Sequence, residues 1–240
     1  GTRNVAIGHA SFEDSNGGNY NTAVGYGTNR DNTTGDNNTS FGYQALNLNT
    51  TGEQNVALGA NALDANTTAN QNTAVGYNSL TDNTTGTNNV ATGGNSLANN
   101  TTGDQNTACG SRALQSNTTA DNNTAVGRDS LKLNTTGASN TAVGEGSLKA
   151  NTTASNNTGL GKDALESNTT GANNIAVGAF ALNSNTTGNT NTAVGYVSLD
   201  SNTTGTSNVA VGYDSLGDSD TAINNTAIGV NSGLGISSGS

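Results

Sequence analysis

The stretch Asn72-Thr-Ala-Val-Gly76-Tyr-Asn-Ser-Leu80-Thr-Asp-Asn83-Thr-Thr-Gly86-Thr-Asn88 recurs with small changes along almost the whole chain. Its leading asparagine returns every 17 residues, at Asn4, Asn21, Asn38, Asn55, Asn72, Asn89, Asn106, Asn123, Asn140, Asn157, Asn174, Asn191, Asn208 and Asn225. This gives 13 complete repeats and a partial one. Repeats built from helical pairs need more than about 30 residues, whereas a shorter fixed period is typical of one coil of a β-solenoid.

Three consecutive positions of each repeat predict a short strand. Counting from the leading asparagine, position two is Thr, Val or Ile, position three is almost always Ala, and position four is usually Val, Ile or Leu. Since alternate residues of a strand share a face, we expect positions two and four to point into the coil and the alanines to point away. Position five is always Gly, which indicates either a positive φ at a corner or the close approach of a neighbouring chain.

The rest of the repeat predicts a second wall and a closing turn. Position nine is Leu in eleven coils, from Leu46 to Leu216, and is expected to point inward. The segment Asn-Thr-Thr-Gly or Asn-Thr-Thr-Ala that follows has a turn composition. Seventeen residues at about 3.3 Å each make a flattened loop of two short strands.

These patterns predict an all-β fold, a parallel β-solenoid (β-roll) of 17-residue coils. Each coil has few apolar side chains whose burial could offset the conformational entropy lost when the coil becomes ordered. We therefore expect self-association, most simply a parallel homotrimer with its Ala-Gly face inward. The repeat predicts a single solenoid domain over residues 1–240, with atypical end coils at 1–20 and 208–240. Because the chain begins at Gly1-Thr2-Arg3, just before a repeat, we expect targeting or anchoring segments to lie outside it.

Composition and charge exclude several classes of partner. The formal net charge is −10 and the pI is about 4.1, which argues against binding to nucleic acid or to an anionic membrane. No apolar run approaches the roughly 20 residues that span a bilayer, so no membrane insertion is expected. Cys109 is the single cysteine and stands in the apolar column at position four, where a small buried hydrophobic residue is expected.

The motifs Asn4-Val-Ala-Ile-Gly8 and Asn55-Val-Ala-Leu-Gly59 resemble the strand repeat of YadA-type heads of trimeric autotransporter adhesins. The whole unit is still more similar to the Asn-Thr-Ala-Val-Gly-Tyr repeats of phage tail fibres and related bacterial surface proteins. The resemblance covers nearly the whole chain. It implies a trimeric parallel β-roll used as a shaft or head.

Enzymatic activity has little support in the sequence. His9 is the only histidine, so neither a Ser-His-Asp site nor a site with several histidine ligands can form within the chain. Gly-rich segments lack the spacing of a phosphate-binding loop, and aspartates do not recur at a fixed position as in calcium-binding solenoids. We therefore predict no catalytic residues, no cofactor and no metal.

Three surface features are candidate contact or modification sites. Five tyrosines share position six and form either a contact column for sugars or simple corner packing: Tyr26, Tyr43, Tyr77, Tyr196 and Tyr213. The threonines of the turns could present a hydroxyl lattice to ice. The turns also match the Asn-x-Thr acceptor pattern of glycosylation at Asn32, Asn49, Asn66, Asn83, Asn100, Asn117, Asn134, Asn151, Asn168, Asn185 and Asn202, although an Asn/Thr-rich composition produces such matches by itself.

Together these features predict a non-enzymatic, extracellular structural fibre on a cell or virion surface, either a tail-fibre shaft or an adhesin head used for display and attachment. Its expected partners are other copies of itself, as a homotrimer or filament, and a glycan or protein on a host surface. The alternatives are the subunit of a surface filament, glycosylated or not, and an ice-binding β-solenoid.

Overall fold

The computed structural model describes residues 1–236. The chain forms two compact units, Gly1–Asp121 and Asn122–Ser240. The last residues of the predicted C-terminal end coil, 237–240, lie outside the described residues. Each unit is a parallel β-solenoid of 17-residue coils, and no helix occurs in the described part of the chain.

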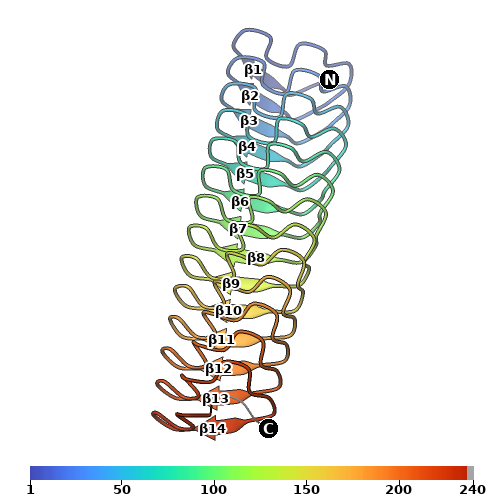
Figure 1. Ribbon diagram of the computed structural model, residues 1–240. Helices are drawn as coiled ribbons and strands as arrows, with labels where there is room; N and C mark the ends of the chain where they lie inside the picture. The colour runs from blue at the N-terminus through green and yellow to red at the C-terminus, as the bar shows by residue number, and fades with distance from the viewer. Residues whose placement is uncertain (237–240) are drawn as a thin grey trace. The chain divides into compact units, whose positions relative to one another are not determined.

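Each coil contributes one strand of three residues, and successive strands within a unit lie side by side (Figure 1). The strands of the first unit are β1 (Val5–Ile7), β2 (Thr22–Val24), β3 (Thr39–Phe41), β4 (Val56–Leu58), β5 (Thr73–Val75), β6 (Val90–Thr92) and β7 (Thr107–Cys109). Those of the second unit are β8 (Thr124–Val126), β9 (Thr141–Val143), β10 (Thr158–Leu160), β11 (Ile175–Val177), β12 (Thr192–Val194), β13 (Val209–Val211) and β14 (Thr226–Ile228).

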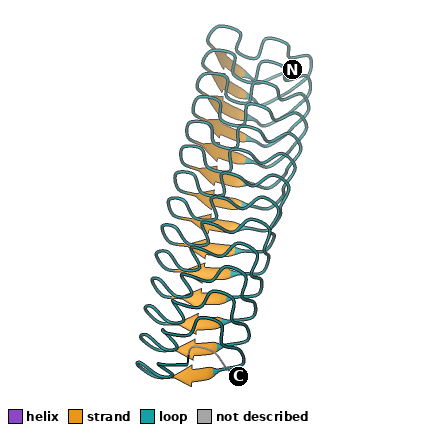
Figure 2. Ribbon diagram, in the orientation of Figure 1, coloured by secondary structure: helices purple, strands orange, loops and turns teal. Residues whose placement is uncertain are grey.

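Neighbouring strands within a unit pair in parallel with a shift of one repeat. Thr73 of β5 pairs with Val90 of β6, and Ala74 pairs with Ala91. Every column of the repeat therefore becomes a ladder of equivalent residues along the unit. The strands occupy one side of each coil and irregular backbone forms the rest (Figure 2).

The inward face of the strands is the alanine column, which corrects the expected orientation. Ala57, Ala74 and Ala91 are fully buried, whereas Val75 at position four is only half-buried and Val90 at position two is exposed. The small side chain leaves room for position eight of the opposite wall, where the Ser79 hydroxyl donates to the carbonyl of Ala91 at 3.0 Å. The coil is too narrow for a large residue on both walls.

The second wall is not a strand, although a strand was expected there. Leu80 and its ten equivalents are fully buried, as predicted, but their backbone is left-handed, with φ of 52° at Leu80. Asn78, two residues earlier, is left-handed as well, with φ of 50°. A left-handed non-glycine residue costs roughly 1–2 kcal/mol, and burial of the leucine side chain offsets that cost.

Two ladders of buried asparagine connect the coils. At position one, the backbone N–H of Asn72 donates to the side-chain oxygen of Asn55 at 3.0 Å. At position twelve, the amide of Asn83 donates to the side-chain oxygen of Asn66 at 3.2 Å. The amides of Asn72 and Asn83 also both donate to the carbonyl of Gly86, each at 2.9 Å. The two ladders thus meet at position fifteen and close the coil.

The glycine at position five has the expected positive φ, and the backbone that approaches it comes from the next coil instead of a neighbouring chain. Gly76 has φ of 134°, and a Cβ placed on it would lie 2.6 Å from the carbonyl oxygen of Gly93 in the next coil. The approaching backbone therefore belongs to the same chain. Gly94, which directly follows Gly93, has no such constraint, because a Cβ added there would meet no atom within 4 Å beyond its chain neighbours.

We predict that Asn100→Ala lowers the free energy of unfolding by about 2–4 kcal/mol, because the substitution removes a fully buried amide and leaves its partners unpaired. The amide of Asn100 donates to Asn83 and Gly103, and its oxygen accepts from Asn117. Urea unfolding followed by circular dichroism measures the change. Thr102→Ala, at an exposed position of the same turn, is the matched control and should change stability by less than about 0.5 kcal/mol. Equal effects of the two substitutions would contradict the asparagine ladder.

A second prediction compares two glycines one residue apart in the repeat. Gly76→Ala should destabilise by about 2 kcal/mol or more, because the new methyl group meets backbone and the φ is unfavourable. Gly94→Ala should be neutral or stabilise by up to about 1 kcal/mol, since the site has open space and alanine restricts the unfolded chain. Thermal unfolding of both variants checks the difference, and a tolerated Gly76→Ala would refute the close approach of the coils.

Candidate functional surfaces

The outer face of the strands is an uncharged surface of apolar and threonine side chains. Positions two and four, which form it, contain only Val, Ile, Leu, Phe, Thr and Cys. Leu160 is 46% exposed and Ile175 is 43% exposed, and Val90 and Val126 are also exposed. We call the side chains at positions two and four the strand face. Large exposed apolar side chains gathered on one face are typical of an interaction surface.

Cys109 lies on this strand face, at the last residue of β7. Its side chain is exposed and forms no disulfide, which corrects the expectation of a small buried residue. The reason is the same reversal that places the alanines inside: position four points outward. The thiol is therefore a reporter group on the candidate interface.

The position-six tyrosines do not pack into a corner. Tyr26 and Tyr43 are about half exposed and stack with ring centroids 5.4 Å apart and planes 8° from parallel. His9 continues this stack on the other side of Tyr26, also at 5.4 Å. In the second unit Tyr196 and Tyr213 stack at 5.9 Å. Stacked rings cover one another's faces, so Tyr26 has no open face for a sugar.

Tyr77 is the exception among these tyrosines. Its neighbours in the column are Ala60 and Gly94, so no ring lies in either adjacent coil, and Tyr77 is 60% exposed. The structure thus separates the predicted contact column into rings that cover one another and one ring that stands alone. The sequence contains the signal for this difference, in the alanine and the glycine that interrupt the column.

The asparagines of the candidate glycosylation motifs belong to the buried ladder at position twelve. All eleven, including Asn83 and Asn151, are fully buried. A glycan on a ladder amide of the folded coil would displace its hydrogen bonds to the neighbouring coil and to position fifteen. This burial argues against modification after folding.

The two threonines of each turn differ in exposure. The hydroxyl of Thr84 donates to the backbone carbonyl of Thr101 in the next coil at 3.0 Å. Thr85, the next residue, is exposed. Equivalent exposed threonines at position fourteen are Thr34, Thr51, Thr68, Thr102, Thr119, Thr136, Thr153, Thr170, Thr187 and Thr204. Each unit therefore carries a column one threonine wide.

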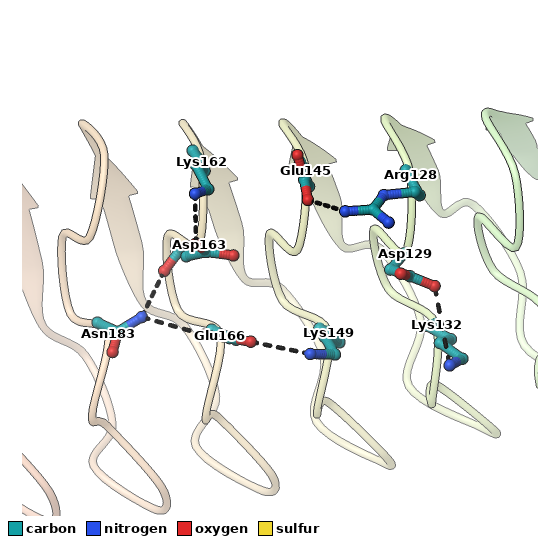
Figure 3. Close-up of polar contacts among 9 residues, drawn as sticks. All are labelled: Arg128, Asp129, Lys132, Glu145, Lys149, Lys162, Asp163, Glu166 and Asn183. Carbon is teal, nitrogen blue, oxygen red and sulfur yellow. Dashed lines mark hydrogen bonds and ion pairs between the residues drawn. The ribbon is translucent and has the colours of Figure 1, made fainter.

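In three coils of the second unit, charged side chains at positions six, seven and ten form ion pairs (Figure 3). Arg128 pairs with Glu145 one coil away, and Lys149 pairs with Glu166 one coil away at 3.0 Å. Pairs within single coils are Asp129 with Lys132 and Lys162 with Asp163. The Arg128–Glu145 and Lys149–Glu166 pairs are well exposed to solvent, so each contributes little to stability.

The charges of this cluster affect one another. The hydrogen bond from Arg128 lowers the pKa of Glu145, and the hydrogen bond to Glu166 raises the pKa of Lys149. Burial raises the pKa of Asp163, and the nearby charge of Glu166 raises it further. The amide of Asn183 donates to the Asp163 carbonyl at 2.9 Å and so joins the cluster to the following coil. The paired charges of both signs form a solvated surface with no unpaired cluster of one sign.

Within residues 1–236 the structure has no enclosed pocket and no group of three or more His, Cys, Asp or Glu side chains placed to hold a metal ion. The same residues include no helix long and apolar enough to cross a bilayer. The candidate surfaces are therefore the strand face, the open ring at Tyr77 and the threonine columns.

Sequence reasoning missed an amide ladder next to the aromatic column. The side-chain amide of Asn61 donates to Asn78 at 3.0 Å, and that of Asn78 donates to Asn95 at 3.4 Å. Three asparagines at position seven of successive coils were the available signal.

Comparisons with protein-family models, with curated proteins and with solved structures found no match to this chain.

Proposed function

We propose that the chain is a non-enzymatic structural module of an extracellular fibre, of the tail-fibre shaft or adhesin-head type, and that it self-associates through the strand face. The observation that carries the proposal is the outward apolar surface. A solenoid that needed only its own interior would have no reason to place Leu160 and Ile175 in water on the same face of successive coils.

Charge favours this face over the others. The chain carries a formal net charge of −10, so copies repel one another, and the repulsion is weakest where the surfaces that meet carry no charge. Positions two and four have no charged residue in any coil. The expected trimer contact therefore moves from the alanines, which are inside the coil, to the side chains at positions two and four.

A parallel, in-register assembly follows from the ladder geometry. The strand face has the same side-chain pattern in coil after coil, so it complements a second copy best when equivalent coils lie at the same level. The resemblance to trimeric fibre repeats favours three chains around an axis. An open filament of the same subunit is the alternative arrangement.

Ice binding is a second candidate function, favoured by the exposed threonine columns. Thermal hysteresis of the unmodified protein measures it directly. Replacing Thr68, Thr85 and Thr102 together by lysine should abolish the hysteresis if this column meets ice. A parent protein without hysteresis excludes the function.

The native cysteine tests the assembly. In a parallel in-register trimer through the strand face, Cys109 of neighbouring chains meets at the same level, so mild oxidation or a short bismaleimide should link two of the three chains. Light scattering before oxidation should give three times the mass of one chain. Denaturing electrophoresis of the oxidised sample should show a covalent dimer and a residual single chain.

The matched control moves the thiol. In a Cys109→Ser, Thr119→Cys variant, the cysteine lies on the exposed turn of the same coil, and cross-linking at equal protein concentration should be lost. A monomer by light scattering, or cross-links from position 119 but not from Cys109, would contradict association through the strand face.

A further inference from the structure

The aromatic column of the first unit has one missing ring. Position six carries His9, Tyr26 and Tyr43 in successive coils, then Ala60, then Tyr77. The three rings before the gap are nearly parallel and 5.4 Å apart, so they stack from coil to coil. Tyr26 covers one face of the Tyr43 ring, and the other face is on the side of the coil that contains Ala60.

The usual spacing of paired strands leaves room for one ligand group between the positions of Tyr43 and Tyr77. Tyr43 and Tyr77 are two coils apart, which separates their backbones by about 10 Å at the usual spacing of paired strands. A group centred between the two rings would lie about 5 Å from each, which is within the range of cation–π contact. We call the space over Ala60, between Tyr43 and Tyr77, the ring gap.

The charge around the ring gap selects a cation. Between residues 31 and 111 the chain has no lysine or arginine. The same segment contains the acidic residues Asp31, Asp36, Glu53, Asp64, Asp82 and Asp104. The ring faces carry negative electrostatic potential, and this segment of the chain has only negative formal charges, so an organic cation is favoured over an anionic group.

The chain itself places cations on rings at two other points. The guanidinium of Arg3 lies 5.2 Å from the ring centroid of Tyr20, and the ammonium of Lys162 lies 5.6 Å from that of Phe180. In the second case Lys162 is at position six, and Phe180 is at position seven of the next coil, directly after Ala179. There the side chain of Lys162 supplies the cation from within the chain. At the ring gap, the residue one coil before Ala60 is Tyr43, so the chain supplies no cation of its own there.

From this geometry we propose that the ring gap is a binding site for an organic cation, an alkylated ammonium or guanidinium group, held between Tyr43 and Tyr77. This goes beyond the proposed structural function and does not depend on it. The site is open to solvent on one side, so a single contact is weak. Repetition of the site on several chains of an assembly would raise the avidity.

Choline is the probe, and its neutral isostere 3,3-dimethylbutan-1-ol is the matched ligand control. Titration of the full-length protein, followed by the NMR signals of the tyrosine rings, should shift Tyr43 and Tyr77 and leave Tyr26 unchanged. The neutral isostere should bind at least about 2- to 5-fold more weakly, the ratio expected for one exposed cation–π contact. A methyl pyranoside tests the sugar alternative in the same assay.

Two variants separate the site from general loss of structure. Tyr77→Ala should weaken choline binding by about 2- to 5-fold, because one ring is lost. Ala60→Tyr should complete the stack, abolish choline binding and leave the thermal midpoint unchanged or higher. Tyr26→Leu, which removes a ring away from the gap, should retain choline binding.

Equal binding of choline and its isostere, preferential binding of the pyranoside, or unchanged choline binding by Ala60→Tyr would each overturn the proposal. None of these results would bear on self-association, which the cysteine cross-links report separately.

Discussion

A buried amide that must hydrogen-bond to its own copy in the next coil is the interaction on which this structure depends. Burial of leucine and alanine supplies free energy but no register, because apolar contacts are not directional. The asparagine ladders supply the register. Asn72 and Asn83 would each be a costly unpaired group unless the equivalent residue stood one repeat away. The fixed 17-residue period is a consequence of that requirement.

Because the register is held inside, the outer positions can change without disturbing the coil. Position six shows this freedom, with Tyr26, Gly94 and Arg128 at equivalent places. The strand face is different: positions two and four also point outward, yet they never carry a charge. Their restriction has no cause within the coil's own interior. The proposed self-association would supply one, because a second copy would cover these positions, and this supports the proposal more strongly than the number of apolar residues does.

The period, the parallel stacking and the buried leucine wall follow from the sequence, because each depends on spacing alone. The orientation of the strand does not. Period-two alternation identifies two faces without saying which is inside, and size was a misleading guide since Ala74 and Ser79 fill a coil too narrow for Val75. The left-handed backbone of Leu80 could not be predicted either, because local propensity opposes it and the burial that offsets its cost exists only in the complete coil.

At the candidate site, too, the sequence predicts which residues share a column but not how their side chains are arranged. The sequence placed Tyr43 and Tyr77 in one column, but only the stacking of Tyr26 on Tyr43 shows which faces are covered and which are open. The two proposed surfaces are neighbours in the chain, because Val75 of the strand face and Tyr77 of the ring gap lie on either side of Gly76. If chains associate in register through positions two and four, every ring gap in the assembly lies at the same level. A weak contact at each would then be reinforced by the others, provided that the ligand cations are spaced to match.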